Sequence, residues 1–219
     1  MKTLSITLLL ASAVTAAGCL SATGDPVQPN ASVRVINATE GPIDVIIDGR
    51  TVAAGLPLAS VSSKLEVSPG THQLQLQPVT GNPVSLSVES GTGDIVTAAA
   101  YQGTQSSMDA TVLVDTGAIV PAGRSKLRVV HLASTANSVE IWRSQPDFQT
   151  PVHIMTPFPY QATSPYLQST PGSWEVFVTA SGTSTKLATT GPVQVPSGER
   201  RTVVLLDSAG VLRFRVIAE

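Results

Sequence analysis

The chain contains one short strand-like stretch twice. Ser32–Ala38 has the sequence SVRVINA, and Lys126–Leu132 has the sequence KLRVVHL. Each copy alternates apolar and polar residues, which is typical of a half-buried β-strand. Each also stands at the head of a similar series of short apolar runs, and such self-similarity indicates a repeated structural unit. We therefore interpret the 219 residues as two domains, each of roughly 90 to 95 residues.

The runs that follow the first copy indicate strands joined by tight turns. Asp48-Gly49 separates the apolar run Ile43–Ile47 from Arg50–Val52. This dipeptide predicts a hairpin, because a type I′ turn needs positive φ at both central residues. About seven short strands without a convincing helix predict an antiparallel sandwich. The expected fold is all-β, with two tandem antiparallel β-sandwich domains of the Ig-like or transthyretin-like kind, at residues 31–122 and 123–219.

The composition supports two packed cores and excludes one class of partner. Hydrophobic residues make up 42% of the chain, which is enough for a core in each half. Charged residues make up only 13%, and the net charge is −2. No basic field is therefore present to attract nucleic acid.

The N-terminus has the pattern of an export signal. Lys2 precedes an apolar run from Leu4 to Val14, which is too short to span a bilayer but suits a secretory signal. Cys19, the only cysteine of the chain, follows Ala16-Ala17-Gly18. This arrangement resembles the bacterial lipoprotein processing site, although Ala16 stands where leucine is usual. We predict a lipoprotein signal peptide at residues 1–18 and lipidation (a palmitate-type anchor) at Cys19; ordinary signal cleavage is the alternative.

The segment after the cysteine is expected to be a tether. Residues 19–30 contain Gly24, Pro26 and Pro29 and show no periodicity, as in a flexible linker. The predicted partner is thus a membrane, reached through the lipid anchor. Leu20 replaces the aspartate that retains lipoproteins in the inner membrane of enteric bacteria, which favours the outer membrane or cell surface of the envelope in a Gram-negative source.

The second copy departs from the first in one segment. Arg34 corresponds to Arg128, 94 residues later, but Ser68-Pro69-Gly70 corresponds to Thr170-Pro171-Gly172, 102 residues later. Most of the added residues fall within 142–166, which is also rich in proline. Five of the nine aromatic residues lie there: Trp142, Phe148, Phe158, Tyr160 and Tyr166. Exposed rings could bind a sugar or a partner surface; alternatively, the rings cover the open end of the second sandwich.

No known catalytic or metal-binding pattern is found. The sequence lacks a Gly-x-Ser-x-Gly elbow, a His-Glu-x-x-His motif and a phosphate-binding loop. His72, His131 and His153 are far apart, and the first two share strand faces with apolar residues, which favours packing over metal binding. Asp44 and Glu140 occupy matched positions and are interpreted as structural carboxylates beside a turn, with a shared ligand-facing role as the alternative. We expect no cofactor, no metal and no catalytic residue.

The repeated unit resembles a bacterial family. The series Val33–Ala38, then Ile43–Gly49, then the Ser68-Pro69-Gly70-Thr71 turn is similar to the domain of unknown function 4397. The resemblance extends over nearly all of residues 31–219 as two copies; the second lacks the Asp-Gly turn and has Glu140 in place of Asp44. The family implies an exported, β-rich and often lipid-anchored envelope protein, and it supplies no established activity or catalytic residues.

These observations lead to three hypotheses. The first is a non-enzymatic, lipid-anchored cell-envelope protein that acts as a binding or scaffolding module, with an envelope protein or glycan as partner. The second is a carbohydrate- or peptide-binding protein that uses the segment 142–166. The third, and most remote, is a secreted hydrolase.

Overall fold

The computed structural model describes residues 30–103, 107–114 and 119–219. The predicted signal peptide, Cys19 and the tether up to residue 29 lie outside the described residues. Within the described ranges, no helix is long and apolar enough to cross a membrane.

The first half of the chain forms two facing sheets, which we call the N-terminal sandwich. Its strands are β1 (Ala31–Ala38), β2 (Ile43–Ile47), β3 (Arg50–Leu56), β4 (Ser60–Val61), β5 (Leu65–Val67), β6 (Gly70–Pro78), β7 (Val84–Ser90), β8 (Ile95–Gln102) and β9 (Met108–Val114). One sheet has the order β4-β1-β8-β9, with β5 also paired to β1, and we call it the N-terminal inner sheet. The other has the order β3-β2-β6-β7, and we call it the N-terminal outer sheet.

The second half forms the C-terminal sandwich in the same manner. Its elements are β10 (Ser125–Leu132), β11 (Ser138–Gln145), the 3₁₀ turn η2 (Pro146–Phe148), β12 (Gln149–Pro159), β13 (Leu167–Ser169), β14 (Gly172–Ala180), β15 (Lys186–Val195), β16 (Arg200–Ser208) and β17 (Val211–Ala218). The C-terminal inner sheet has the order β13-β10-β16-β17, and the C-terminal outer sheet has the order β12-β11-β14-β15. The two sandwiches therefore share one strand order.

The predicted all-β sandwich fold is confirmed, with one difference in strand direction. β1 pairs with β8 in parallel, and β10 pairs with β16 in parallel, while the other pairs are antiparallel. A parallel pair needs a long crossover connection, and here the strands of the outer sheet supply it. The boundary between residues 122 and 123 and the duplication itself stay predictions.

Local turn chemistry accounts for the first hairpin. Asp48 and Gly49 have φ values of 49° and 78°, so both central residues are in the left-handed region, as the Asp-Gly dipeptide predicts. Asp48 also accepts a hydrogen bond from the backbone N–H of Gln73 on β6 at 2.9 Å, which ties the turn to the neighbouring strand.

Each sandwich has its own apolar core between its two sheets. In the N-terminal sandwich, Val33 and Val35 of β1 pack with Leu74 and Leu76 of β6. In the C-terminal sandwich, Val129 of β10 and Val203 of β16 pack with the outer-sheet core residues. Successive residues of a strand point to opposite faces, so these cores use only every second residue.

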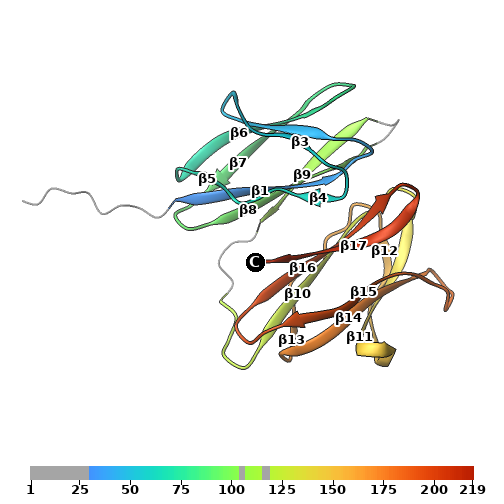
Figure 1. Cartoon of the computed structure of the whole chain (residues 1–219). Coiled ribbons are helices and arrows are strands. Elements are labelled where there is room, and N and C mark those ends of the chain that lie inside the picture. Colours follow the sequence, from blue (N-terminus) through green and yellow to red (C-terminus); the bar gives the residue numbers. More distant parts are fainter. Residues whose placement is uncertain (1–29, 104–106, 115–118) are drawn as a thin grey trace, which may run out of the picture.

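A third apolar cluster joins the two inner sheets to each other. It contains Ile36, Ala38, Ala99, Tyr101 and Leu113 from the N-terminal sandwich and Val130, Leu132, Val204, Leu206 and Ile217 from the C-terminal sandwich. Figure 1 accordingly shows β1 and β8 of the upper sandwich facing β16 and β17 of the lower one. The central strands β1, β8, β10 and β16 of the inner sheets are therefore covered on both faces, while the edge strand β17 is largely exposed and the outer sheets lie on the outside.

The arginines of the two similar stretches, Arg34 and Arg128, are buried in this interface. Arg34 and Arg128 are each 4% exposed. The Glu219 carboxylate lies 2.5 Å from Nη2 of Arg34 and 3.8 Å from Nη2 of Arg128. Arg34 also donates to Thr97, its parallel neighbour on β8, and Arg128 donates to Thr202, its parallel neighbour on β16. The alternation of these strands predicts half-buried strands, but both faces are covered, because the other sandwich packs against the side that carries Arg34 or Arg128.

We expect Glu219→Gln to destabilise the protein by about 3–5 kcal/mol, because it leaves buried arginines without their carboxylate. The matched control is Glu199→Gln, whose ion pair with Arg201 is at the surface and should contribute about 0–1 kcal/mol. Urea unfolding at neutral pH measures both changes. Equal effects of the two substitutions would contradict a buried ionic link between the sandwiches.

Candidate functional site

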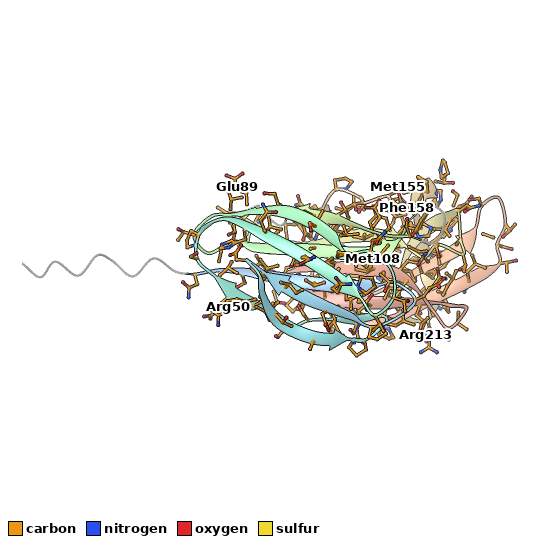
Figure 2. The ribbon with its side chains drawn as sticks, turned by 90° about the horizontal axis from the view of Figure 1, so that it is seen from above. Arg50, Glu89, Met108, Met155, Phe158 and Arg213 are labelled. Atoms are coloured by element: carbon orange, nitrogen blue, oxygen red, sulfur yellow. The ribbon has the colours of Figure 1, made fainter. Side chains whose placement is uncertain are left out.

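The segment 142–166 contains the end of β11, η2, β12 and the connection to β13. β11 and β12 form a hairpin, and β12 is an edge strand of the C-terminal outer sheet. η2 joins the two strands, and Asp147, Phe148 and Thr150 have φ values of 60°, 57° and 47°. Such values are uncommon for residues other than glycine and persist only where surrounding contacts hold them. Figure 2 shows Met155 and Phe158 of β12 toward the opposite end of the molecule from Arg50 and Glu89. The segment therefore lies far from the chain's first described residues.

Trp142 lies on the outer face of the C-terminal outer sheet, between two other rings. The centroid of the His153 ring is 4.5 Å from that of Trp142, and the centroid of Phe177 is 6.0 Å away, with an interplanar angle of 5°. The indole Nε1–H donates to Oγ1 of Thr179 at 3.2 Å. His153, Trp142 and Phe177 thus form a row across β12, β11 and β14.

Phe148 lies beside this row and carries a cation on its ring. Its ring meets that of Phe177 edge to face, at 5.2 Å and 86°. Nζ of Lys186 lies 3.1 Å from the Phe148 centroid. The backbone N–H of Phe148 donates to Oε2 of Glu175 at 3.3 Å. We call Trp142, Phe148, His153, Phe177, Glu175 and Lys186 the aromatic face.

Phe158 is placed in the core instead. It is 1% exposed and packs with Val139 and Ile141 between the sheets of the C-terminal sandwich. Its ring stacks on that of His131 at 6.2 Å. His131 is itself fully buried, and burial lowers the pKa of this imidazole to about 4, so it is neutral at physiological pH. The interpretation of His131 as a packed histidine agrees with this position.

Tyr160 and Tyr166 lie near the contact between the sandwiches. Tyr160 meets Tyr101 of the N-terminal sandwich edge to face at 6.2 Å, and its hydroxyl donates to the carbonyl oxygen of Gln102. Burial raises the pKa of Tyr160 to about 12. The guanidinium of Arg128 lies 4.5 Å from the Tyr166 ring. The five predicted ligand-binding residues therefore do not form one surface: only Trp142 and Phe148 lie together on the aromatic face.

The aromatic face differs from the equivalent face of the N-terminal outer sheet. Trp142 and Phe177 are partners in the β11–β14 register, and Ile46 and Gln75 are partners in the β2–β6 register. The polar residues Gln73 and Gln77 flank Gln75, as expected for a sheet face toward water. Phe177, Glu175 and Lys186 were not predicted from the sequence as site residues. Phe177 could have been found by aligning the two halves at the offset of 102 residues, which places it opposite the polar residue Gln75.

Glu175 is the buried carboxylate of this face. It is 4% exposed and accepts hydrogen bonds from Thr189 Oγ1 at 2.7 Å and from the Phe148 N–H. Its register partner Ser144 is fully buried, and the Ser144 hydroxyl has no hydrogen-bond partner among the described residues. No ion pair to Glu175 occurs within the described ranges. Because Val176 and Val178 face the core, Glu175 lies on the same outer face of β14 as Phe177, and its buried carboxyl group is next to the rings.

The two matched carboxylates, Asp44 and Glu140, have different partners. Asp44 accepts from the backbone N–H of Gly55 at 2.6 Å. Glu140 accepts from the N–H of Gly182 at 2.9 Å and lies 3.8 Å from Nε2 of His153. Asp44 therefore links β2 to β3, and Glu140 links β11 to the turn between β14 and β15. In the part of the chain that the structure describes, no three histidine, cysteine or acidic side chains gather as a metal site.

His72 lies between two acceptors. Its Nδ1 is 2.6 Å from Oδ2 of Asp48, and its Nε2 is 2.7 Å from the carbonyl oxygen of Ser68. The hydrogen bond to Asp48 raises the pKa of His72, and the same bond lowers the pKa of Asp48. An imidazole held at both nitrogens cannot accept a proton from a serine hydroxyl. The pair therefore joins the first hairpin turn to β6 and does not form a hydrolase dyad.

Two cavities lie between the sandwiches. One, of about 370 Å³, is lined by Arg128, Tyr166 and Thr111 among others. The other, of about 320 Å³, is lined by Glu40, Gln102 and Asp207 among others. The Asp207 carboxylate already accepts bonds from the hydroxyl of Ser134 and the backbone of Thr135. Neither cavity includes a residue of the aromatic face.

We predict that Asp48→Asn lowers stability in a pH-dependent manner. Because the pKa of His72 is raised above 6.5 in the folded state, its contribution is full below that pH and is lost as the pH rises through the raised pKa. The difference in urea midpoint between the two proteins should therefore be largest near about pH 5.5 and shrink toward about pH 9. NMR titration of His72 provides the direct measurement. A His72 pKa that is the same in both proteins would contradict the pairing.

Solved structures give only weak likenesses. A candidate cell adhesion protein from Bacteroides ovatus is 10% identical, with 89% of this chain and 97% of that chain covered and a TM-score of 0.25. A candidate cell adhesion protein from Bacteroides fragilis is 15% identical, with 84% and 85% covered and a TM-score of 0.22. Scores this low support no argument about the chain. Among curated proteins, none matches its sequence.

A family profile assigns the chain to a family. The domain of unknown function DUF4397 matches residues 31–142. The match begins at β1, spans the N-terminal sandwich and continues through β10 to Trp142 in β11. Because it covers more than half of the chain, the protein belongs to the DUF4397 family.

Proposed function

We propose that the protein is a non-enzymatic binding module of the cell envelope, which presents the aromatic face to a partner. The observation that carries this proposal is the difference between the two outer sheets. Trp142 and Phe177 stand where the N-terminal sandwich has Ile46 and Gln75. These rings point away from the core of their own sandwich: Trp142 is half-buried on the outer face, and Phe177 is 5% exposed because Trp142 and Phe148 pack against it. A partner surface gives them a role.

The packing of the two inner sheets supports a scaffolding role as well. Domains of one chain usually move relative to one another unless their interface is large and hydrophobic. Here the apolar cluster between the inner sheets also encloses Arg34, Arg128 and Glu219. The two sandwiches would therefore act as one body, with the aromatic face held at a fixed orientation.

The contacts of the rings favour a peptide or protein partner over a sugar. A sugar stacks on an open ring face. The two faces of Trp142 are next to His153 and Phe177, and the face of Phe148 is next to Lys186. A partner would meet ring edges, the imidazole of His153 and the ammonium of Lys186.

Anchoring through Cys19 belongs to the same proposal and rests on the sequence. Expression of the full chain in a bacterial host with labelled palmitate should label the protein, and Cys19→Ala should abolish the label, because Cys19 is the only thiol that an acyl group can occupy. Fractionation of the same cells should move the variant out of the membrane fraction. Label that persists in Cys19→Ala would refute the anchor.

The aromatic face is tested by giving it the residues of the other sheet. We expect Trp142→Ile with Phe177→Gln, in the unlipidated Cys19→Ala protein, to lower co-sedimentation with isolated cell envelopes at least about tenfold, because aromatic anchors dominate binding energies. Ile46→Ala with Gln75→Ala is the matched control and should bind as the parent does. Urea unfolding checks that each variant is folded. Undiminished binding by the folded Trp142→Ile, Phe177→Gln protein would overturn the proposal.

A further inference from the structure

Lys186 places its ammonium group in the angle between two perpendicular rings. Nζ lies 3.1 Å from the centroid of Phe148 and 5.2 Å from that of Phe177, and the two ring planes meet at 86°. Both distances are within the range of a cation–π interaction. Two perpendicular aromatic walls around a cation form the kind of cage that proteins use to bind ammonium groups.

The surroundings of this cage favour a positive charge. Glu175 is 4% exposed, and its hydrogen-bond partners among the described residues are the neutral donors Thr189 Oγ1 and the Phe148 N–H. The fully buried Ser144 hydroxyl, next to Glu175 in the register, has no hydrogen-bond partner among the described residues. A buried carboxylate is costly without a cation, so the field from Glu175 favours an ammonium group over a neutral one.

Phe148 is held in place by the backbone. The left-handed residues Asp147, Phe148 and Thr150 fold η2 over the outer sheet, and the Phe148 N–H is fixed by Glu175. Because the Phe148 ring is already held in position, it loses little conformational freedom when a ligand binds.

Lys186 itself is replaceable. It is exposed at the start of β15, directly after the exposed residues 181–185, and within the described residues it has no ion-pair partner. Its interaction with the cage is therefore a surface cation–π contact on a long and flexible side chain, which an external ammonium group can replace.

We propose that Phe148, Phe177 and Glu175 form a binding site for the ammonium group of a lysine side chain on a peptide partner, and that Lys186 fills this site in the free protein. The inference rests on the proposed function, because it names the chemical group that the aromatic face recognises. A divalent metal ion fits less well, since Glu175 is the one carboxylate among the residues of the aromatic face.

The test uses the Cys19→Ala protein and a defined probe, Nα-acetyl-lysine-N-methylamide, with its Nε-acetylated form as the neutral control. Lys186→Ala should bind the amine about three- to tenfold more tightly than the parent, because the internal competitor is gone. Lys186→Arg, which keeps a cation on the rings, should not show the gain. Adding Phe148→Ala or Glu175→Gln to Lys186→Ala should remove it.

A ligand-free measurement checks the occupancy by Lys186. In NMR spectra of the parent, the ε-methylene protons of Lys186 should be shifted upfield by the ring of Phe148, and Phe148→Ala should abolish the shift. No gain in Lys186→Ala, or equal binding of the neutral probe, would overturn the ammonium site. If the amine test fails but the Trp142→Ile, Phe177→Gln protein still loses envelope binding, only this inference fails. If the changes to the aromatic face reduce neither envelope binding nor amine binding, both proposals fail.

Discussion

The packing of the two inner sheets against each other is the constraint on which the rest of the structure depends. β1, β8, β10 and β16 are buried on both faces, one toward the core of their own sandwich and one toward the other sandwich. Polar side chains on the shared side must then find partners within the protein. Arg34 and Arg128 do so through Glu219 and through the threonines of their parallel neighbours. An apolar interface with an ionic link fixes which faces remain outside.

Because the central strands of the inner sheets are covered by this contact, the outer sheets provide the broad faces of the molecule that lie away from it. The N-terminal outer sheet has glutamines and serines on its outer side, which suit water. The C-terminal outer sheet has the aromatic face, where η2 brings Phe148 over Phe177 and where Glu175 is buried beside Phe177. The two sandwiches have the same strand order and different outer surfaces. The two sandwiches thus have a common framework and differ in the side chains of their outer faces.

The segment 142–166 illustrates how one sequence feature can contribute to several structural roles. Phe158 fills the core, Tyr160 contacts the other sandwich, Tyr166 packs beside Arg128, and Trp142 and Phe148 lie on the outer sheet. The concentration of rings in the sequence does not mean a single aromatic surface. A hairpin alternates its side chains between faces, so neighbouring rings separate as soon as the strands form.

The sequence by itself determined the strands, the Asp48-Gly49 turn, the all-β sandwich and the family, because these depend on local alternation and turn chemistry. The change of residue offset between the two similar series also located the segment 142–166, in which the two sandwiches differ. Only the tertiary structure decided that β1 and β8 run parallel, that Arg34 and Arg128 are buried, and that Phe177 and Lys186 join Trp142 and Phe148. Period-two alternation shows that a strand has two faces. What each face meets depends on residues distant in the chain, and the pattern of a single strand carries no information about them.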